Sequence, residues 1–407
     1  MCAYFLTLLL LGLALPGFAA DVGAATVTRG QYLTRLADCR ACHTQPGRAA
    51  FAGGVPIKTP FGAIYTPNIT PDKETGIGAW SFDDFYRAMH LGLDENGDYL
   101  YPAFPFPAYT RMTREDVKAI WNYLQTVEPV QREDEANTLR WPYSMRSLMG
   151  VWRQFYFQPG TFQPDPDASA AVNRGAYLVR GVAHCGACHT PRNRWGATME
   201  KYFLAGGSIP VEGWYPPNIT PNPHVGIGDW SDDALKTFLT SGRSEAGAAL
   251  GPMRDVVQSS LQYLNDADLN AIVAYLKQVP AIGPEQVKVK HARVFAGKDK
   301  KKLPGEVLYG KHCAGCHGDE GRARHDYFPD LHNNPIVLSR NPTNLILIML
   351  QGGFEAATEA HPYPHSMPPF GFKLSDKDIA HIANYVRRNW DNRVVPQIQP
   401  RDIAPLR

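Results

Sequence analysis

Six of the seven cysteines form three pairs in which two residues separate the cysteines and a histidine directly follows the second one. This C-x-x-C-H spacing is typical of covalent c-type haem attachment, in which two thiols bond to the haem and the adjacent imidazole binds the iron. The sequence therefore predicts three covalently bound haem c groups. The predicted haem-binding cysteines are Cys39 with Cys42, Cys185 with Cys188, and Cys313 with Cys316, and the predicted iron ligands are His43, His189 and His317.

Two other uses of paired cysteines fit the spacing less well. A zinc ribbon commonly has two such pairs about 15–20 residues apart, whereas these pairs begin at positions 39, 185 and 313 and are far more widely separated. A thioredoxin-like pair needs a surrounding βαβ pattern, but proline-rich segments flank these motifs. A structural metal-binding module is kept as an alternative, and it predicts bound zinc and no Soret absorption.

The composition is that of an ordinary globular protein with several domains. The 407 residues allow two to four domains of about 100–200 residues each. A net charge of +2 and 44% hydrophobic residues exclude a strongly basic nucleic-acid-binding protein and a disordered chain. The 34 prolines and 36 glycines favour long loops between short helices over extended sheets.

The N-terminal segment, positions 1–25, has the pattern of an export signal. An apolar stretch over residues 4–20 leads into small residues between Ala19 and Ala25 that suit cleavage by signal peptidase. No Lys or Arg precedes Arg29, so an uncleaved anchor is the alternative. The apolar stretch is short for a membrane span, and no later stretch reaches about 18 consecutive apolar residues.

An internal repeat relates the first two haem motifs. The segment at residues 65–71 recurs at 215–221, and the segment at 76–81 recurs at 226–231, which indicates that the first two domains are duplicates. The third domain lacks this Asn-Ile-Thr loop. The predicted boundaries are 1–25 for the export signal, 26–158, 168–280 and 290–395 for the three domains, and 396–407 for a tail.

Proline-rich segments at 158–167 and 280–284 are the predicted linkers. The second is followed by a Lys-rich run at 288–302. We interpret this run as a solvated strap, with a docking patch for an acidic partner as the alternative.

All three domains share a closing helix. Thr113, Asn265 and Ser375 are predicted N-caps, each followed three residues later by an aspartate. Apolar residues then recur at i, i+3, i+4 and i+7, which is typical of a helix with one buried face. We expect each closing helix to pack on the helix that bears the C-x-x-C-H motif.

Two methionines are predicted sixth ligands of iron, because Met commonly lies opposite the His in electron-transfer haems. Met253 lies a short way before Leu269 of one closing helix, and Met367 lies a short way before Ile379 of another. Both are expected in loops that lead into the closing helix. The alternative for a methionine at such a position is core packing.

The first domain departs from this pattern. Its matching position holds Phe104, which has no lone pair for iron. Met112 precedes an N-cap and is interpreted as a hydrophobic staple. Met89 and His90 are interpreted as packing residues of an earlier helix, and remain candidate ligands after a local rearrangement. Our hypothesis is that the first haem is five-coordinate, water-bound or unusually ligated.

Several short stretches of the chain match a known family in order and spacing: residues 59–62, 65–70, 100–103, 174–178, 184–191, 367–370 and 384–386. Through them the whole mature chain resembles the three-haem cytochrome c subunits of bacterial membrane-associated dehydrogenases, which serve enzymes that oxidise alcohol, gluconate, sorbitol, fructose and aldehydes. Many relatives carry a methionine after the Tyr-Pro-Ala of the first domain, where this chain has Phe104.

The resemblance implies a mainly α protein with three tandem cytochrome c domains joined by long Pro- and Gly-rich loops. It also implies electron receipt from a catalytic subunit that carries flavin, pyrroloquinoline quinone or molybdopterin, and delivery to ubiquinone or another respiratory acceptor. The expected location is the periplasmic side of the inner membrane, with peripheral attachment. It does not identify the substrate.

The sequence contains no motif of a substrate-oxidising centre: no Rossmann fingerprint, P-loop, G-x-S-x-G or spare cysteine nucleophile. Three haems in one chain therefore favour an electron relay over an enzyme. The alternative is a haem peroxidase that uses the first haem, which lacks a methionine, as an open site. His184, Arg192 and Arg194 are weaker candidates for contacts around the second haem.

Overall fold

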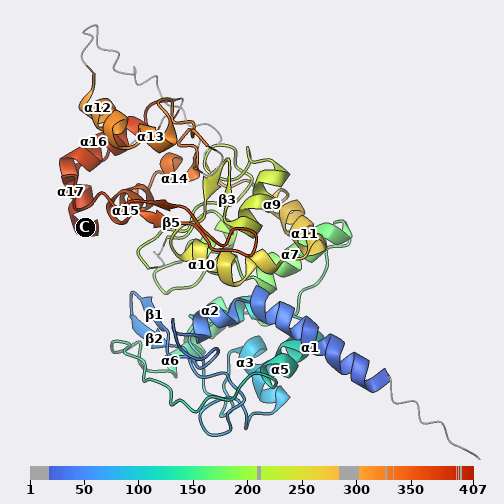
Figure 1. The fold of residues 1–407 in the computed structure, drawn as a ribbon. Coiled ribbons are helices and arrows are strands. Elements are labelled where there is room, and N and C mark those ends of the chain that lie inside the picture. The colour runs from blue at the N-terminus through green and yellow to red at the C-terminus, as the bar shows by residue number, and fades with distance from the viewer. Residues whose placement is uncertain are drawn as a thin grey trace, which may run out of the picture.

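The computed structural model describes residues 18–208, 212–283, 302–325, 328–332, 334–390, 392, 394 and 397–407. These residues are mostly helical, with three two-stranded antiparallel sheets. The predicted mainly α class is confirmed. In Figure 1 the second domain, in green and yellow, lies between the first, in blue and teal, and the third, in orange and red.

The first domain contains α1 (Phe18–Leu36), α2 (Cys39–His43), β1 (Pro56–Thr59), β2 (Gly62–Tyr65), α3 (Phe82–Leu91), α4 (Phe106–Tyr109), α5 (Arg114–Leu124) and α6 (Leu148–Tyr156). The second contains α7 (Ala170–Tyr177), η1 (Leu178–Val182), α8 (Gly186–His189), η2 (Glu200–Tyr202), α9 (Asp232–Ser241), β3 (Arg243–Ser244), β4 (Gly247–Ala248), α10 (Pro252–Ser259), η3 (Leu261–Tyr263) and α11 (Asp266–Leu276). The third contains α12 (Pro304–His312), α13 (Ala314–His317), α14 (Pro335–Leu338), α15 (Thr343–Gln351), β5 (Gly353–Phe354), β6 (Ser366–Met367), α16 (Asp376–Val386), α17 (Pro400–Ile403) and η4 (Ala404–Leu406).

Several predicted features lie partly outside the described residues. Positions 1–17 of the export signal are outside them, and positions 18–25 belong to α1. The Lys-rich run is outside except for Lys302. The linker at 158–167 contains no helix or strand, and its Phe162 packs against the core with its ring 5.8 Å from that of Tyr177. In the described part of the chain, no helix has both the length and the apolar character needed to cross a bilayer.

The three closing helices α5, α11 and α16 begin at the predicted N-caps. The side chains of Thr113, Asn265 and Ser375 each accept a hydrogen bond from the backbone N–H three residues later, at 3.2, 2.9 and 3.2 Å. Such a cap satisfies one of the free N–H groups of the first turn. The apolar stripe of each helix is buried, as its periodicity predicts.

The partner of each closing helix differs from our expectation. The haem motifs form separate short helices, and the closing helices α5, α11 and α16 pack instead on the preceding helices α1, α7 and α12. A glycine stands at each crossing. A Cβ atom on Gly30, Gly175 or Gly305 would lie 1.9, 2.0 or 2.3 Å from a backbone carbonyl oxygen of the closing helix. Only glycine allows these backbones to approach so closely.

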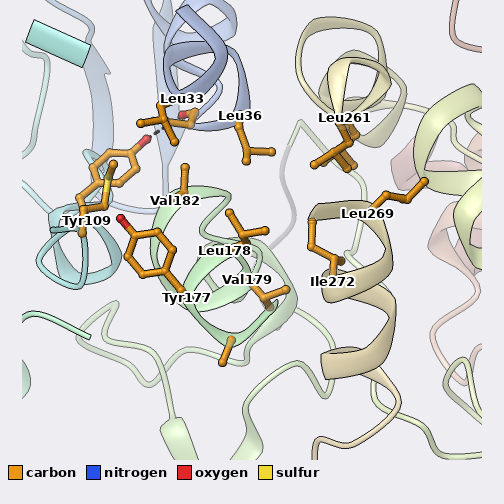
Figure 2. Packing of buried hydrophobic residues seen from close by; sticks show 14 of the residues in the cluster. Leu33, Leu36, Tyr109, Tyr177, Leu178, Val179, Val182, Leu261, Leu269 and Ile272 are labelled. Carbon is orange, nitrogen blue, oxygen red and sulfur yellow. Dashed lines mark hydrogen bonds between the residues drawn. The ribbon is translucent and has the colours of Figure 1, made fainter. Parts of the chain in front are cut away.

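One hydrophobic core joins the first two domains, whereas the third domain has its own. Figure 2 shows Leu33 and Leu36 of α1 beside Leu178 and Val182 of the second domain. These side chains come from both duplicates, so the two domains form one packing unit.

A reciprocal exchange of hydrogen bonds ties the same two domains. Tyr32 of α1 donates to Asp268 of α11 at 2.7 Å, and Tyr177 of α7 donates to Asp116 of α5 at 2.6 Å. Burial alone would raise the pKa of Asp268, but hydrogen bonds from Arg174 and Tyr32 outweigh it and lower the pKa. This stabilisation is present above the ordinary aspartate pKa and is lost as the pH falls through the lowered value.

The third domain is attached to the second mainly by polar contacts, with Ala356 buried against the core of the first two domains. Asn344 makes a pair of hydrogen bonds to the backbone of Tyr215, both at 2.8 Å. Gln262 accepts a hydrogen bond from the backbone of Glu359 at 2.9 Å, and Arg243 contacts the ring of His361 at 2.9 Å. Tyr215 belongs to the loop that repeats Tyr65, so the third domain touches a segment next to the second haem motif.

We expect Gly305→Ala to destabilise the third domain by roughly 1–3 kcal/mol or more, because the added Cβ would force α12 and α16 apart. Gly310→Ala on the same helix is the control, since no atom lies within 4 Å of its added Cβ. Alanine there should stabilise the helix by about 1 kcal/mol. Denaturant unfolding measures both changes, and equal effects would contradict the close approach at Gly305.

Candidate haem-binding sites

Each C-x-x-C-H motif forms one short helical turn, in α2, α8 and α13, a short way after the first helix of its domain. No disulfide joins these six cysteines. Burial raises the pKa of Cys39, Cys185 and Cys313 to about 12.

The three predicted iron-binding histidines share one hydrogen bond. The Nδ1 atoms of His43, His189 and His317 lie 2.7, 2.8 and 3.0 Å from the carbonyl oxygens of Pro67, Pro217 and Pro329. A carbonyl oxygen only accepts, so each ring donates through Nδ1 and leaves Nε2 with a free lone pair. Metal-binding histidines commonly have their second nitrogen held in this way.

The surroundings also keep these rings neutral. Desolvation lowers the pKa of His43, His189 and His317, and the bond to the proline carbonyl opposes this shift only in part. Neutral imidazole is the form that binds a metal. The residues therefore fit the haem group, since each motif supplies two thiols and one oriented, neutral imidazole.

The repeated Asn-Ile-Thr loop positions the proline carbonyls. Asn68 donates to the carbonyl of Val130 at 2.7 Å and accepts from the backbone of Thr70 at 3.0 Å. In the second domain Asn218 donates to Ile282 at 2.7 Å and accepts from Thr220 at 2.8 Å. In both domains the loop is thus tied to the chain that follows the closing helix. Sequence analysis found this repeat but not its role.

The third domain reaches the same result with different residues. Pro329 supplies the carbonyl, although no Asn-Ile-Thr loop surrounds it. Asn392, which follows the closing helix α16, donates to the carbonyl of Leu331 at 2.9 Å. In the third domain the asparagine that fixes the loop therefore lies in the segment after the closing helix, whereas in the first two domains it lies in the loop itself. In the sequence, the only sign of this contact is that a proline, Pro329, follows His317 by 12 residues.

A family model for cytochrome c matches residues 27–128, 172–280 and 303–390. The chain belongs to the cytochrome c family. It is 40% identical to the cytochrome c subunit of the quinone alcohol dehydrogenase of Komagataeibacter europaeus, over 95% of this chain and 85% of that one. It is also 40% identical to the gluconate 2-dehydrogenase cytochrome c subunit of Pantoea cypripedii, over 94% and 90%. The fructose dehydrogenase cytochrome subunit of Gluconobacter japonicus is 39% identical, over 92% and 81%.

This cytochrome has its two candidate methionine ligands in regular elements, and the expectation that both lie in loops is wrong. Met253 is in the first turn of α10 and packs against the core of the first two domains. Met367 is in β6, paired with Gly353, and packs against the core of the third domain. Both side chains are half-buried, and both elements precede the closing helix of their domain.

The candidate residues of the first domain are mostly packed. Phe104 is half-buried, with its ring 5.5 Å from that of Tyr109. Met112 is fully buried and Met89 is buried, in line with their interpretation as packing residues. His90 stacks on Tyr86 at 5.0 Å.

The weaker candidates near the second haem motif make protein contacts. His184 lies at the junction of the first two domains, where its Nε2 is 3.3 Å from the carbonyl oxygen of Ala37. Arg192 donates to the carbonyls of Ala187 and Gly196, each at 2.7 Å. Arg194 lies over the ring of Trp195. His184 therefore makes a contact between the first two domains.

We expect Asn218→Ala to cost about 1–3 kcal/mol of stability, because it leaves buried partners unpaired. It should also shift the reduction potential of the second haem alone, since the His189 bond to Pro217 loosens. Potentiometric titration of the three haems measures the shift. Asn193→Ala is the control, because its side chain bonds only within residues 193–197. An equal shift in the reduction potentials of all three haems, or no shift in any of them, would count against this role of Asn218.

Proposed function

We propose that this cytochrome is the electron-transfer subunit of a bacterial dehydrogenase complex. It holds three covalent haem c groups through its three C-x-x-C-H motifs. It takes electrons from a separate catalytic subunit that carries flavin, pyrroloquinoline quinone or molybdopterin, and passes them to ubiquinone or another respiratory acceptor. Haem supplies reversible one-electron chemistry when bound. The observation that carries the proposal is the same oriented, neutral histidine in all three motifs.

The contacts between domains support a relay within one chain. The Cys42 thiol has a pKa raised by desolvation, with smaller contributions from Asp38 and from Cys188 of the second domain. Cys42 of the first motif therefore lies near Cys188 of the second. Asn344 of the third domain holds Tyr215, two residues before the proline that orients His189. The shared core of the first two domains and these hydrogen bonds support a defined arrangement of the three motifs.

The protein sets each haem potential through the axial ligands and the hydrogen bonds around them. We propose His189 with Met253 for the second haem and His317 with Met367 for the third. The first haem has His43 and no methionine at the matching position, which Phe104 occupies. A haem without a methionine ligand has a lower potential, so the three haems are not equivalent.

The alternative of a peroxidase is less well supported. The relatives of similar length are cytochrome subunits of alcohol, gluconate and fructose dehydrogenases.

We also propose that the chain is exported to the periplasmic side of the inner membrane and attached there peripherally.

We expect two of the three ferric haems to show the weak charge-transfer band of an iron–methionine bond. Met253→Ala and Met367→Ala should each remove part of this band, because each deletes one sulfur ligand. Phe104→Met should increase it if the first haem lacks a sulfur ligand. Met112→Leu is the control, since it nearly conserves volume in a buried packing position. An unchanged band in both alanine variants would exclude these two ligands.

Reduction by the partner tests the function itself. The cytochrome is purified from native membranes with its bound subunits, which identifies the catalytic subunit. In stopped-flow mixing with substrate, we expect all three haems to be reduced, and a water-soluble ubiquinone analogue to reoxidise them. Peroxide turnover with an artificial donor, without reduction by any copurified subunit, would favour the peroxidase instead.

A further inference from the structure

Helix α6 and the segment before it carry large apolar side chains on the surface of the first domain. We call residues 139–157 the aromatic arm. Trp141 is 80% exposed and Phe155 is 74% exposed. In α6 the exposed apolar residues Leu148, Val151 and Phe155 follow at i, i+3 and i+7, so they share one face of the helix. An apolar stripe of this kind is normally buried against a core.

The opposite face of α6 carries the charge. Arg153 points toward the protein, where it donates to the carbonyl of Leu91 and lies 5.4 Å from the ring centre of Tyr99 and 4.7 Å from that of Phe157. A Cβ on Gly150 would lie 3.1 Å from the ring of Tyr99, so this face is closely packed. The helix therefore turns its cation inward and its apolar stripe outward, the reverse of an ordinary surface helix.

Defined contacts hold the arm in this orientation. The backbone N–H of Arg140 donates to Phe61 at 3.0 Å, and the ring of Tyr143 lies 4.5 Å from that of Phe61. The indole of Trp152 donates to the carbonyl of Trp195 in the second domain at 3.0 Å. Both joined domains thus fix the arm, and no described residue covers the stripe. A fixed exposed apolar surface of this kind marks an interaction site.

Basic residues predominate along the arm. Residues 136–164 contain three arginines and no aspartate or glutamate. Arg194 adds a further exposed cation beside Trp195. Among the described residues, Arg140 and Arg194 have no carboxylate partner within ion-pair distance. Arg146 pairs with Asp94 at 3.3 Å and Arg153 points inward, so the cations available to a partner are Arg140 and Arg194. They lie beside exposed Trp, Tyr, Phe and Val side chains.

We propose that the aromatic arm lies on the surface of an anionic lipid bilayer and attaches the cytochrome to the membrane. Interfacial segments insert apolar and aromatic residues while basic residues meet anionic headgroups. Headgroups offer negative charge all along the arm, whereas a protein partner would need a carboxylate opposite each arginine. The proposal specifies the peripheral attachment within the proposed function, and it does not depend on which dehydrogenase reduces the haems.

The arm connects to both neighbouring haem sites. Phe61, which holds Tyr143, lies in the turn between β1 and β2, and β2 ends two residues before Pro67. Trp195 follows the second haem motif by six residues. A bilayer on this surface would lie beside the first two haems, which suits delivery of electrons to an acceptor in the membrane.

Vesicle flotation of the complete haem-loaded protein tests the proposal. The probes are vesicles of phosphatidylcholine alone and of phosphatidylcholine with phosphatidylglycerol. We expect the wild type to bind the anionic vesicles, and Val151→Asp/Phe155→Asp to weaken this binding by about tenfold or more, because both exposed side chains leave the stripe and negative charge is added. Arg140→Gln/Arg194→Gln should weaken binding to the anionic vesicles only.

The matched control is Tyr363→Asp/Phe372→Asp, which places the same charges on exposed apolar residues of the third domain. Unchanged vesicle binding in the α6 variant, or an equal loss in the control, would overturn the proposal. So would α6 variants that bind vesicles normally but no longer copurify with the catalytic subunit, since the arm would then be a protein interface. Haem reduction by the catalytic subunit, measured in detergent, reports on the relay separately.

Discussion

Two helices cross at a glycine in every domain, and the rest of each domain depends on that crossing. The helix before the haem motif and the closing helix approach until only a hydrogen atom fits between their backbones, at Gly30, Gly175 and Gly305. The motif follows the first helix of its domain closely along the chain, so its direction follows from the crossing. The loops that supply the proline carbonyls are in turn tied to the chain that leaves the closing helix.

The histidines illustrate how a backbone group takes part in a cofactor site. A carbonyl oxygen can hold Nδ1 only if its loop has one conformation. The loops achieve this through Asn68, which is buried, and Asn218, which is half-buried, both with their hydrogen bonds satisfied. Buried polar groups that are fully paired make a loop rigid, because any other conformation leaves them unpaired. In the third domain, Asn392 of the segment after the closing helix makes the corresponding hydrogen bond to the loop. The shared feature is therefore the bond to the imidazole and not the loop sequence.

The domains are joined in two ways. The first two domains share a core, and Tyr32 and Tyr177 each donate a hydrogen bond to a buried aspartate of the other domain. Neither domain can therefore move without exposing apolar surface and leaving a buried aspartate unpaired. The third domain keeps a separate core and contacts the second mainly through amide and guanidinium groups, with Ala356 buried at the junction. The first junction is therefore held by a shared core, whereas the second is held by hydrogen bonds, an ion pair between Arg243 and Glu355, and this small apolar contact.

The sequence by itself determined the three haem motifs, the duplication, and the closing helices with their caps, because these rest on residue types at short, regular spacing. The sequence did not reveal the roles of Pro67, Pro217 and Pro329, because a contact made by a backbone carbonyl leaves no mark on the residue type. Each proline also lies far along the chain from the histidine that it contacts, at separations of 24, 28 and 12 residues. Tertiary structure also decided which helix each closing helix contacts, and that Met253 lies in a helix. Only the tertiary structure showed the orientation of α6. The periodicity of Leu148, Val151 and Phe155 is the same whether the apolar stripe faces a core or solvent. Because Arg153 points toward the protein, the stripe faces solvent.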